Sequence, residues 1–169
     1  MAELTNRERL QPSLLDRLSD DEPDKRQESR DKRVLSPGRL RESVRRDLGW
    51  LFNTTNLESV QDLEEYPQVA RSVVNFGLPD FAGHTASSVD IPMLEQLLKR
   101  AIWDFEPRLI RNTVKVRLVI DEEDMSHNAM SFDIEAELWA QPIPLRLYLR
   151  TQIDLETGGV EVADMGNKP

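Results

Sequence analysis

The chain has 169 residues, which is enough for one domain and too few for two domains of ordinary size. It contains no cysteine, which excludes disulfides and thiolate metal sites, and no apolar run approaches the ~20 residues that a membrane helix needs. The net charge of −9 argues against a nucleic-acid partner, because such binding relies on lysine and arginine. The first residues lack the apolar segment of a signal peptide, so we expect a cytoplasmic protein with no direct membrane insertion.

A short amphipathic helix is predicted over residues 12–19, because Leu14, Leu15 and Leu18 fall on one helical face. These leucines either pack on the protein's own core or dock on a partner, since an apolar helix on a tether is a common recognition device. The sequence leaves both alternatives open. Deletion of residues 1–20 would separate them, because loss of a core helix causes aggregation whereas loss of a docking helix removes only the partner.

A charged stretch separates this helix from the rest of the chain. In residues 20–33, eleven of fourteen side chains are charged, six acidic and five basic. Such a segment cannot bury enough apolar surface to offset the entropy lost on ordering. We therefore predict a flexible N-terminal arm over residues 1–34 and a single folded domain over residues 35–164.

The first long helix is predicted over residues 37–52, because a serine suits its N-cap, a proline fits its first position and its apolar residues form one stripe. Residues 66–80 follow after a connector. Pro67 can open a short helix there, Gly77 suits a left-handed turn, and Pro79 prevents further helix.

A second long helix begins after Ser88 or Asp90 as N-cap and has a proline in its first turn. Its broad apolar face is the best cover for a sheet, because burial of each leucine or phenylalanine contributes about 1.5–3 kcal/mol. The helix must end near Phe105, since the residue before Pro107 is pushed out of the helical region.

Three strands with alternating apolar and polar residues are predicted between Asn112 and Leu155. The second strand has three carboxylates on its polar face, and the first and third strands have basic residues on theirs. Opposite charges on neighbouring strands stabilise their pairing, so we predict an antiparallel meander in chain order. The charged positions are Lys115 and Arg117, then Asp133, Glu135 and Glu137, then Arg146 and Arg150.

The chain is predicted to return as a short terminal strand over residues 160–163, after a tight turn that contains two glycines. This strand would leave a free sheet edge. The predicted fold class is therefore α+β: an antiparallel or mixed sheet of three to four strands, covered by two or three helices.

Metal and cofactor sites find little support in the sequence. His84 and His127 lie in predicted loops, and neither has a second ligand at helical spacing. Residues 121–124 are all acidic but lack the glycine and the ligand spacing of a calcium loop, so a solvated hairpin loop is the better interpretation. We expect no metal and no cofactor.

Glu106 is the one candidate for acid catalysis, because a carboxyl at the end of an apolar helix can have a raised pKa. A lysozyme-like glycoside hydrolase would pair it with Asp133 or Glu135. Those two carboxylates have basic neighbours, which lower their pKa values and occupy them structurally. The hydrolase would be favoured if the purified protein had muramidase activity above background and the Glu106→Gln variant lost it.

Glu106, Pro107 and Arg108 form the most unusual polar feature of the chain. A helix end with a local ion pair explains these residue types by itself, because Arg108 would lie near the negative end of the helix dipole. A role in partner binding is the alternative.

Several segments taken in order resemble the TssE family, the baseplate subunits of type VI secretion systems, which belong with the phage baseplate wedge proteins once called lysozyme-like. The resemblance extends from about Leu14 to Val162. Each segment alone is weak evidence, and the ordered set is specific. The segments are Leu14–Leu18, Trp50–Thr54, Tyr66–Asp80, Phe105–Arg108 and Phe132–Trp139.

The resemblance implies a structural subunit with no enzymatic activity. Such proteins join the wedge proteins TssF, TssG and TssK and help to initiate the contractile sheath of TssB and TssC. It also implies that Glu106, Pro107 and Arg108 take part in wedge assembly, and that the fold resembles the sheath's own interlocking domain, in which neighbouring subunits exchange strands.

We therefore expect sheath strands to add to the edge formed by residues 145–164, since unpaired backbone groups at an edge accept another strand. Arg146, Tyr148 and Arg150 are the candidate contacts there. We also expect Glu106→Ala or Arg108→Ala to leave the monomer folded and to block wedge assembly.

Overall fold

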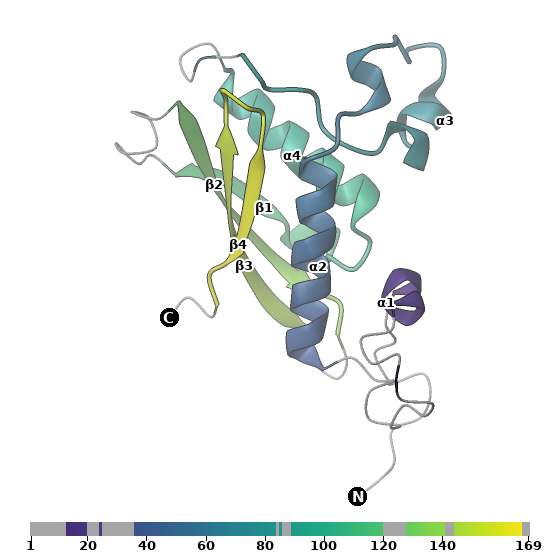
Figure 1. The fold of residues 1–169 in the computed structure, drawn as a ribbon, viewed down its shortest axis with the longest axis vertical. Coiled ribbons are helices and arrows are strands. Elements are labelled where there is room, and N and C mark those ends of the chain that lie inside the picture. The colour runs from purple at the N-terminus through teal and green to yellow at the C-terminus, as the bar shows by residue number, and fades with distance from the viewer. Residues whose placement is uncertain are drawn as a thin grey trace, which may run out of the picture.

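A computed structural model describes residues 13–19, 24, 36–83, 85, 89–119, 128–140 and 144–166 (Figure 1). The fold is α+β, as predicted. Its helices are α1 (Leu14–Leu18), α2 (Pro37–Phe52), α3 (Pro67–Ala70) and α4 (Ile91–Phe105). Its strands are β1 (Lys115–Val119), β2 (Ala129–Leu138), β3 (Leu145–Asp154) and β4 (Val160–Asp164), and the described residues also contain 3-10 turns at η2 (Leu57–Ser59), η3 (Val73–Asn75) and η5 (Arg111–Thr113).

The two long helices begin and end where local chemistry predicts. The Ser36 hydroxyl accepts a hydrogen bond from the Arg39 amide at 3.2 Å, which caps α2. Asp90 rather than Ser88 caps α4, because its carboxylate accepts a bond from the Met93 amide at 3.1 Å. Helix α4 ends at Phe105, two residues before Pro107.

The four strands form one antiparallel sheet in the order β1-β2-β3-β4, which confirms the predicted meander and terminal strand. The register places opposite charges across from each other: Lys115 faces Glu135, and Asp133 faces Arg150. Ion pairs join both couples, at 3.9 Å and 2.9 Å. The first strand begins later than predicted, because Arg111–Thr113 form a 3-10 turn.

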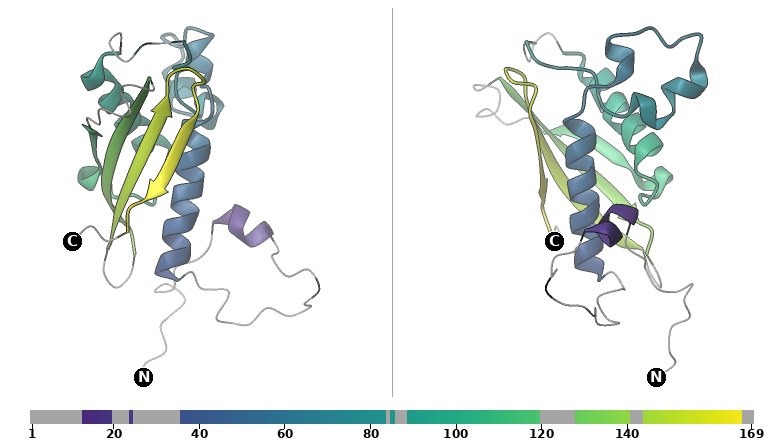
Figure 2. Two further views of the ribbon diagram at one scale, coloured as in Figure 1. Left: turned by 60° about the vertical axis from the view of Figure 1, so that its left-hand side comes forward. Right: turned by 45° about the vertical axis from the view of Figure 1, so that its right-hand side comes forward.

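Helices α2 and α4 cover one face of the sheet (Figures 1 and 2). The core lies between them and the alternate residues of the strands, which leaves the charged residues of β2 and β3 on the other face. Thr151 is the polar exception: it is fully buried within β3, and its hydroxyl has no hydrogen-bond partner among the described residues. The largest fully buried side chains are Phe132, Leu48, Leu51, Leu78, Leu94, Leu98, Ile102, Ile134, Leu138, Leu147, Leu149 and Ile153.

The segment between α2 and α4 folds back on itself at Gly77. Its predicted single short helix is divided into α3 and η3, because Ser72 caps η3 with its own side chain. Leu78 and Thr55 then form a parallel bridge. Gly77 has a φ of 128°, and a Cβ there would lie 2.2 Å from a backbone oxygen of Thr54, so this turn requires glycine.

Candidate partner-binding site

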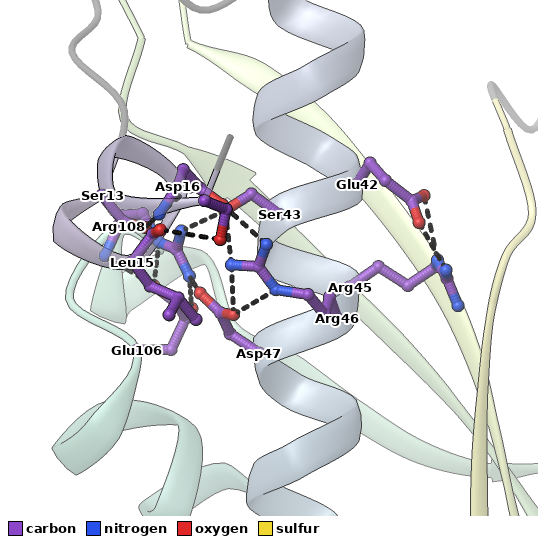
Figure 3. A network of polar contacts seen from close by, with 11 residues as sticks. Ser13, Leu15, Asp16, Glu42, Ser43, Arg45, Arg46, Asp47, Glu106 and Arg108 are labelled. Atoms are coloured by element: carbon purple, nitrogen blue, oxygen red, sulfur yellow. Dashed lines mark hydrogen bonds and ion pairs between the residues drawn. The ribbon is translucent and has the colours of Figure 1, made fainter. Parts of the chain in front are cut away.

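Helix α1 is joined to α2 through the carboxylate of Asp16 (Figure 3). The Ser13 hydroxyl caps α1 by accepting the Asp16 amide at 3.3 Å and also donates to the Asp16 carboxylate at 2.7 Å. Across the interface, the Ser43 hydroxyl and the Arg46 guanidinium donate to Asp16 at 2.8 Å and 2.6 Å. Polar contacts therefore fix a helix that is too short to be stable alone.

The leucines of α1 do not enter the core. Leu14 and Leu18 are 71% and 74% exposed, and Leu15 is 44% exposed. Helix α1 therefore lies on its own domain, as the first alternative expected, but its leucines do not pack into the core. They remain exposed, as the second alternative, docking on a partner, requires.

Glu106 is the C-cap residue of α4, and only 4% of its surface is exposed. The Arg108 side chain donates to both carboxylate oxygens of Glu106, from Nε at 2.7 Å and from Nη2 at 2.5 Å. The Arg108 amide adds a third bond at 3.1 Å. Such a two-pronged pair orients the guanidinium, which remains partly exposed. Pro107, between the two, is exposed.

The same guanidinium reaches α2, so two of the three predicted partner-binding segments, α1 and the Glu-Pro-Arg turn, belong to one network. Arg108 donates to the Asp47 carboxylate at 2.6 Å and to the Ser43 hydroxyl at 3.0 Å. Ser43 in turn donates to Asp16, and therefore connects the Glu-Pro-Arg turn directly to α1. The polar network is defined here as Ser13, Asp16, Ser43, Arg46, Asp47, Glu106 and Arg108 (Figure 3).

Arg46 extends this surface along α2. It pairs with Asp47 at 2.8 Å as well as with Asp16. Its guanidinium also lies 4.9 Å from the centre of the Trp50 ring, a cation–π contact. Trp50 is 51% exposed.

The charges within the network reinforce one another. Burial alone would raise the pKa of Asp16, but hydrogen bonds from Ser13, Arg46 and Ser43 lower it to about 2. Burial alone would lower the pKa of Arg108, but the bonds and charges of Glu106 and Asp47 raise it overall. Both groups are therefore ionised across the physiological range.

The carboxylates of the hydrolase alternative are not brought together with Glu106. Asp133 is bonded to Arg150 on the outward side of β2, at 2.9 Å. Glu135 faces Lys115, while both oxygens of Glu106 accept bonds from Arg108. This arrangement is that of structural ion pairs, and it leaves Glu106 without the carboxyl partners that were considered for it.

The remaining candidate residues lie on β3, on the face of the sheet opposite the helices. Arg146 is exposed, whereas Tyr148 and Arg150 are half-buried. Tyr148 and Arg150 line a shallow depression with Asp133, Glu135 and Met165. This group is not part of the polar network around Arg108.

The sheet edge at β4 is not free along its length, contrary to expectation. The Asn53 side chain accepts a bond from the Val160 amide at 2.9 Å and donates to its carbonyl oxygen at 2.7 Å. Arg45 donates to the carbonyl oxygen of Val162 at 3.1 Å. Arg45 belongs to α2, and Asn53 is its C-cap residue.

The sequence patterns did not predict the α2 residues of the polar network. Arg46 and Asp47 lie about one turn after Ser43 on the helix, beside its apolar stripe, a spacing that could have indicated a polar contact surface. Ser43 has the clearest structural role of the three, because it is a polar residue with only 5% of its surface exposed. Asp16 had no distinguishing signal among the many charged residues of the arm.

Several expectations fall on residues outside the described part of the chain. These are the two histidines, the acidic loop at residues 121–124 and nearly all of the charged stretch at residues 20–33. Where the chain is described, no group of three metal-ligating side chains occurs. In the same residues, no helix has the length and apolar character to cross a bilayer.

Comparison with known families identifies the class of protein. Residues 38–143, more than half of the chain, match the family model of baseplate wedge protein gp25. The chain therefore belongs to this family of structural baseplate proteins, which confirms the resemblance at the family level. Neither curated proteins nor solved structures gave a match.

The matched region includes α2 except Pro37, all of α4 and the Glu-Pro-Arg turn, and thus most of the polar network. Helix α1 lies before it, and β3 and β4 lie after it. Family membership supports interaction with other baseplate proteins.

Proposed function

We propose that this chain is a TssE-type subunit of a type VI secretion baseplate. In this role it joins TssF, TssG and TssK in the wedge and helps to initiate the sheath of TssB and TssC, without enzymatic activity. It would act in the cytoplasm, at the baseplate attached to the inner-membrane complex. The family match and the absence of a free catalytic carboxyl at Glu106 support this proposal.

The observation that carries the proposal is the connection of α1 to Arg108 through Ser43. It positions exposed leucines beside a partly exposed guanidinium on one surface. Exposed apolar groups with a polar surround are typical of protein interfaces. Full burial of each leucine by a partner would contribute about 1.5–3 kcal/mol to binding.

Within this surface, the residues of the Glu-Pro-Arg turn have different roles. Glu106 is too buried to touch a partner directly, so it acts by holding the Arg108 guanidinium in position. Pro107 and the exposed part of Arg108 are the groups that a wedge protein would contact. Asp16 has the equivalent holding role for α1.

The outer face of β3 and the β4 edge are assigned to the sheath. Arg146, Tyr148 and Arg150 would contact side chains of an incoming subunit, while a strand pairs with β4. In this proposal, the folded domain extends over residues 35–164 and residues 1–34 form the arm that presents α1.

The test replaces surface leucines only. Leu14→Ser/Leu18→Ser should leave the fold intact, because both side chains are exposed, and should remove the chain from the wedge complex in gel filtration with TssF, TssG and TssK. Met93→Ser is the matched control, since Met93 is 62% exposed on α4 and lies outside this surface. Unchanged wedge formation by the leucine variant, or failure of the native chain to join these proteins, would overturn the proposal.

A further inference from the structure

The edge of β4 is covered by side chains that imitate a neighbouring strand. The Asn53 amide both accepts from the Val160 N–H and donates to the Val160 carbonyl. Two residues farther along β4, Arg45 donates to the Val162 carbonyl. We name Asn53 and Arg45 the edge clamp.

The ladder geometry shows that these backbone groups are the ones an added strand would use. Odd-numbered residues around β4 bond to β3: the Gly159 carbonyl accepts from Asp154, and the Met165 amide donates to Tyr148. In an antiparallel ladder the alternate residues direct their N–H and C=O groups to the opposite side. Val160 and Val162 therefore present theirs outward.

An asparagine side chain carries the same amide group as a peptide bond. Its two bonds to Val160 are those that one residue of an antiparallel strand would make to this position. Asn53 is itself fixed, because its side chain also donates to the Gly49 carbonyl at 2.7 Å. An added strand and Asn53 thus compete for the same two groups.

Arg45 has a second partner, which it can keep when it leaves Val162. Its guanidinium bonds to the exposed carboxylate of Glu42 as well as to Val162. The other edge of the sheet is protected in a related way, since Glu95 of α4 accepts the Leu118 amide of β1 at 2.8 Å. Covered edges of this kind prevent association with unintended strands.

We propose that the edge clamp closes β4 in the free protein and that an incoming sheath strand must displace Asn53 and Arg45 from Val160 and Val162. This inference rests on the strand-pairing part of the proposed function. It makes the C-terminal end of α2 part of the strand acceptor, and it keeps the edge from pairing before the sheath subunit arrives.

The test compares Arg45→Ala/Asn53→Ala with Arg100→Ala in the full chain. Arg100 is the matched control, since its side chain is 69% exposed on α4. Amide exchange by NMR at Val160 should accelerate at least tenfold in the clamp variant relative to Ile134, whose position in the central strand β2 reports global unfolding. Association with the TssB–TssC heterodimer should become several-fold faster.

Each outcome has one meaning. Exchange at Val160 that changes no more than exchange at Ile134 would overturn the clamp, whether or not the sheath binds. Faster exchange with an unchanged rate of sheath association would show that displacement of the clamp does not limit strand addition, which also contradicts the inference. If neither the native chain nor the variants bind the TssB–TssC heterodimer, the proposed strand-pairing function is wrong. Amide exchange at Val160 alone then decides whether the clamp closes the edge.

Discussion

Arg108→Ala would leave the Glu106 carboxylate without the guanidinium that contacts both of its oxygens. Glu106 is 4% exposed, so its charge would be nearly buried and uncompensated. Removing one partner of a buried ion pair costs roughly 3–5 kcal/mol, whereas an exposed pair contributes less than about 1 kcal/mol. The Arg108 side chain is 25% exposed, so water can partly replace it, and we expect a loss of about 2–3 kcal/mol in the free energy of unfolding.

For a chain of this length, such a loss corresponds to a decrease of about 4–12 °C in Tm. The variant should remain folded at 25 °C, yet fail to join the wedge. Thermal melts followed by circular dichroism measure the first effect, and gel filtration with TssF, TssG and TssK measures the second.

Arg150→Ala is a matched control, because Arg150 also forms an ion pair with a carboxylate at 2.9 Å, but with its side chain 37% exposed. It should lower the free energy of unfolding by less than about 1 kcal/mol. The burial argument is refuted if Arg108→Ala melts within experimental error of the native chain or no lower than Arg150→Ala. Glu106→Leu/Arg108→Met should recover most of the loss, since an apolar pair leaves no buried charge.

Three further predictions concern stability and the attachment of α1. Thr151→Val should raise the free energy of unfolding in urea by about 1 kcal/mol, because it removes a buried hydroxyl with no described partner; a lower value would contradict this. Gly77→Ala should cost about 3 kcal/mol or more, because its φ is 128° and a backbone oxygen lies 2.2 Å from the added Cβ, whereas Gly38→Ala, with open space around it, should not destabilise. The pKa of Asp16 is lowered to about 2 from 3.8, so its contribution to holding α1 should be complete above about pH 4 and be lost as the pH falls through about 2. By NMR, Asp16→Ala should show a detached α1 at pH 7 and Leu18→Ser an attached one; an attached α1 in Asp16→Ala would contradict the role of this carboxylate.

Local patterns in the sequence were sufficient for the architecture. Alternation fixed the faces of the strands, and the charges of Lys115, Glu135, Asp133 and Arg150 indicated the correct neighbours across the sheet. Capping residues and prolines located the ends of both long helices. These features succeed because each depends on residues that are close in the chain or on adjacent strands.

The polar network and the edge clamp could not be predicted in the same way. Arg108 and Ser43 are hydrogen-bonded although they lie 65 positions apart in the sequence. The bonds between Ser43 and Asp16 and between Asn53 and Val160 span 27 and 107 positions. No periodic pattern relates such residues, since the contacts depend on how α1, α2 and β4 pack together. The sequence therefore located Glu106 and Arg108 as candidates but not the residues that connect them to α1.

If α1 and the Glu-Pro-Arg turn form one wedge-facing surface, a structure of the reconstituted wedge, formed from this chain with TssF, TssG and TssK, should show it. We expect Leu14, Leu18 and Pro107 to be buried together against a wedge protein in that structure, with Asp16 still bonded to α2. A wedge in which these side chains remain exposed to solvent while the chain is bound through another surface would contradict it.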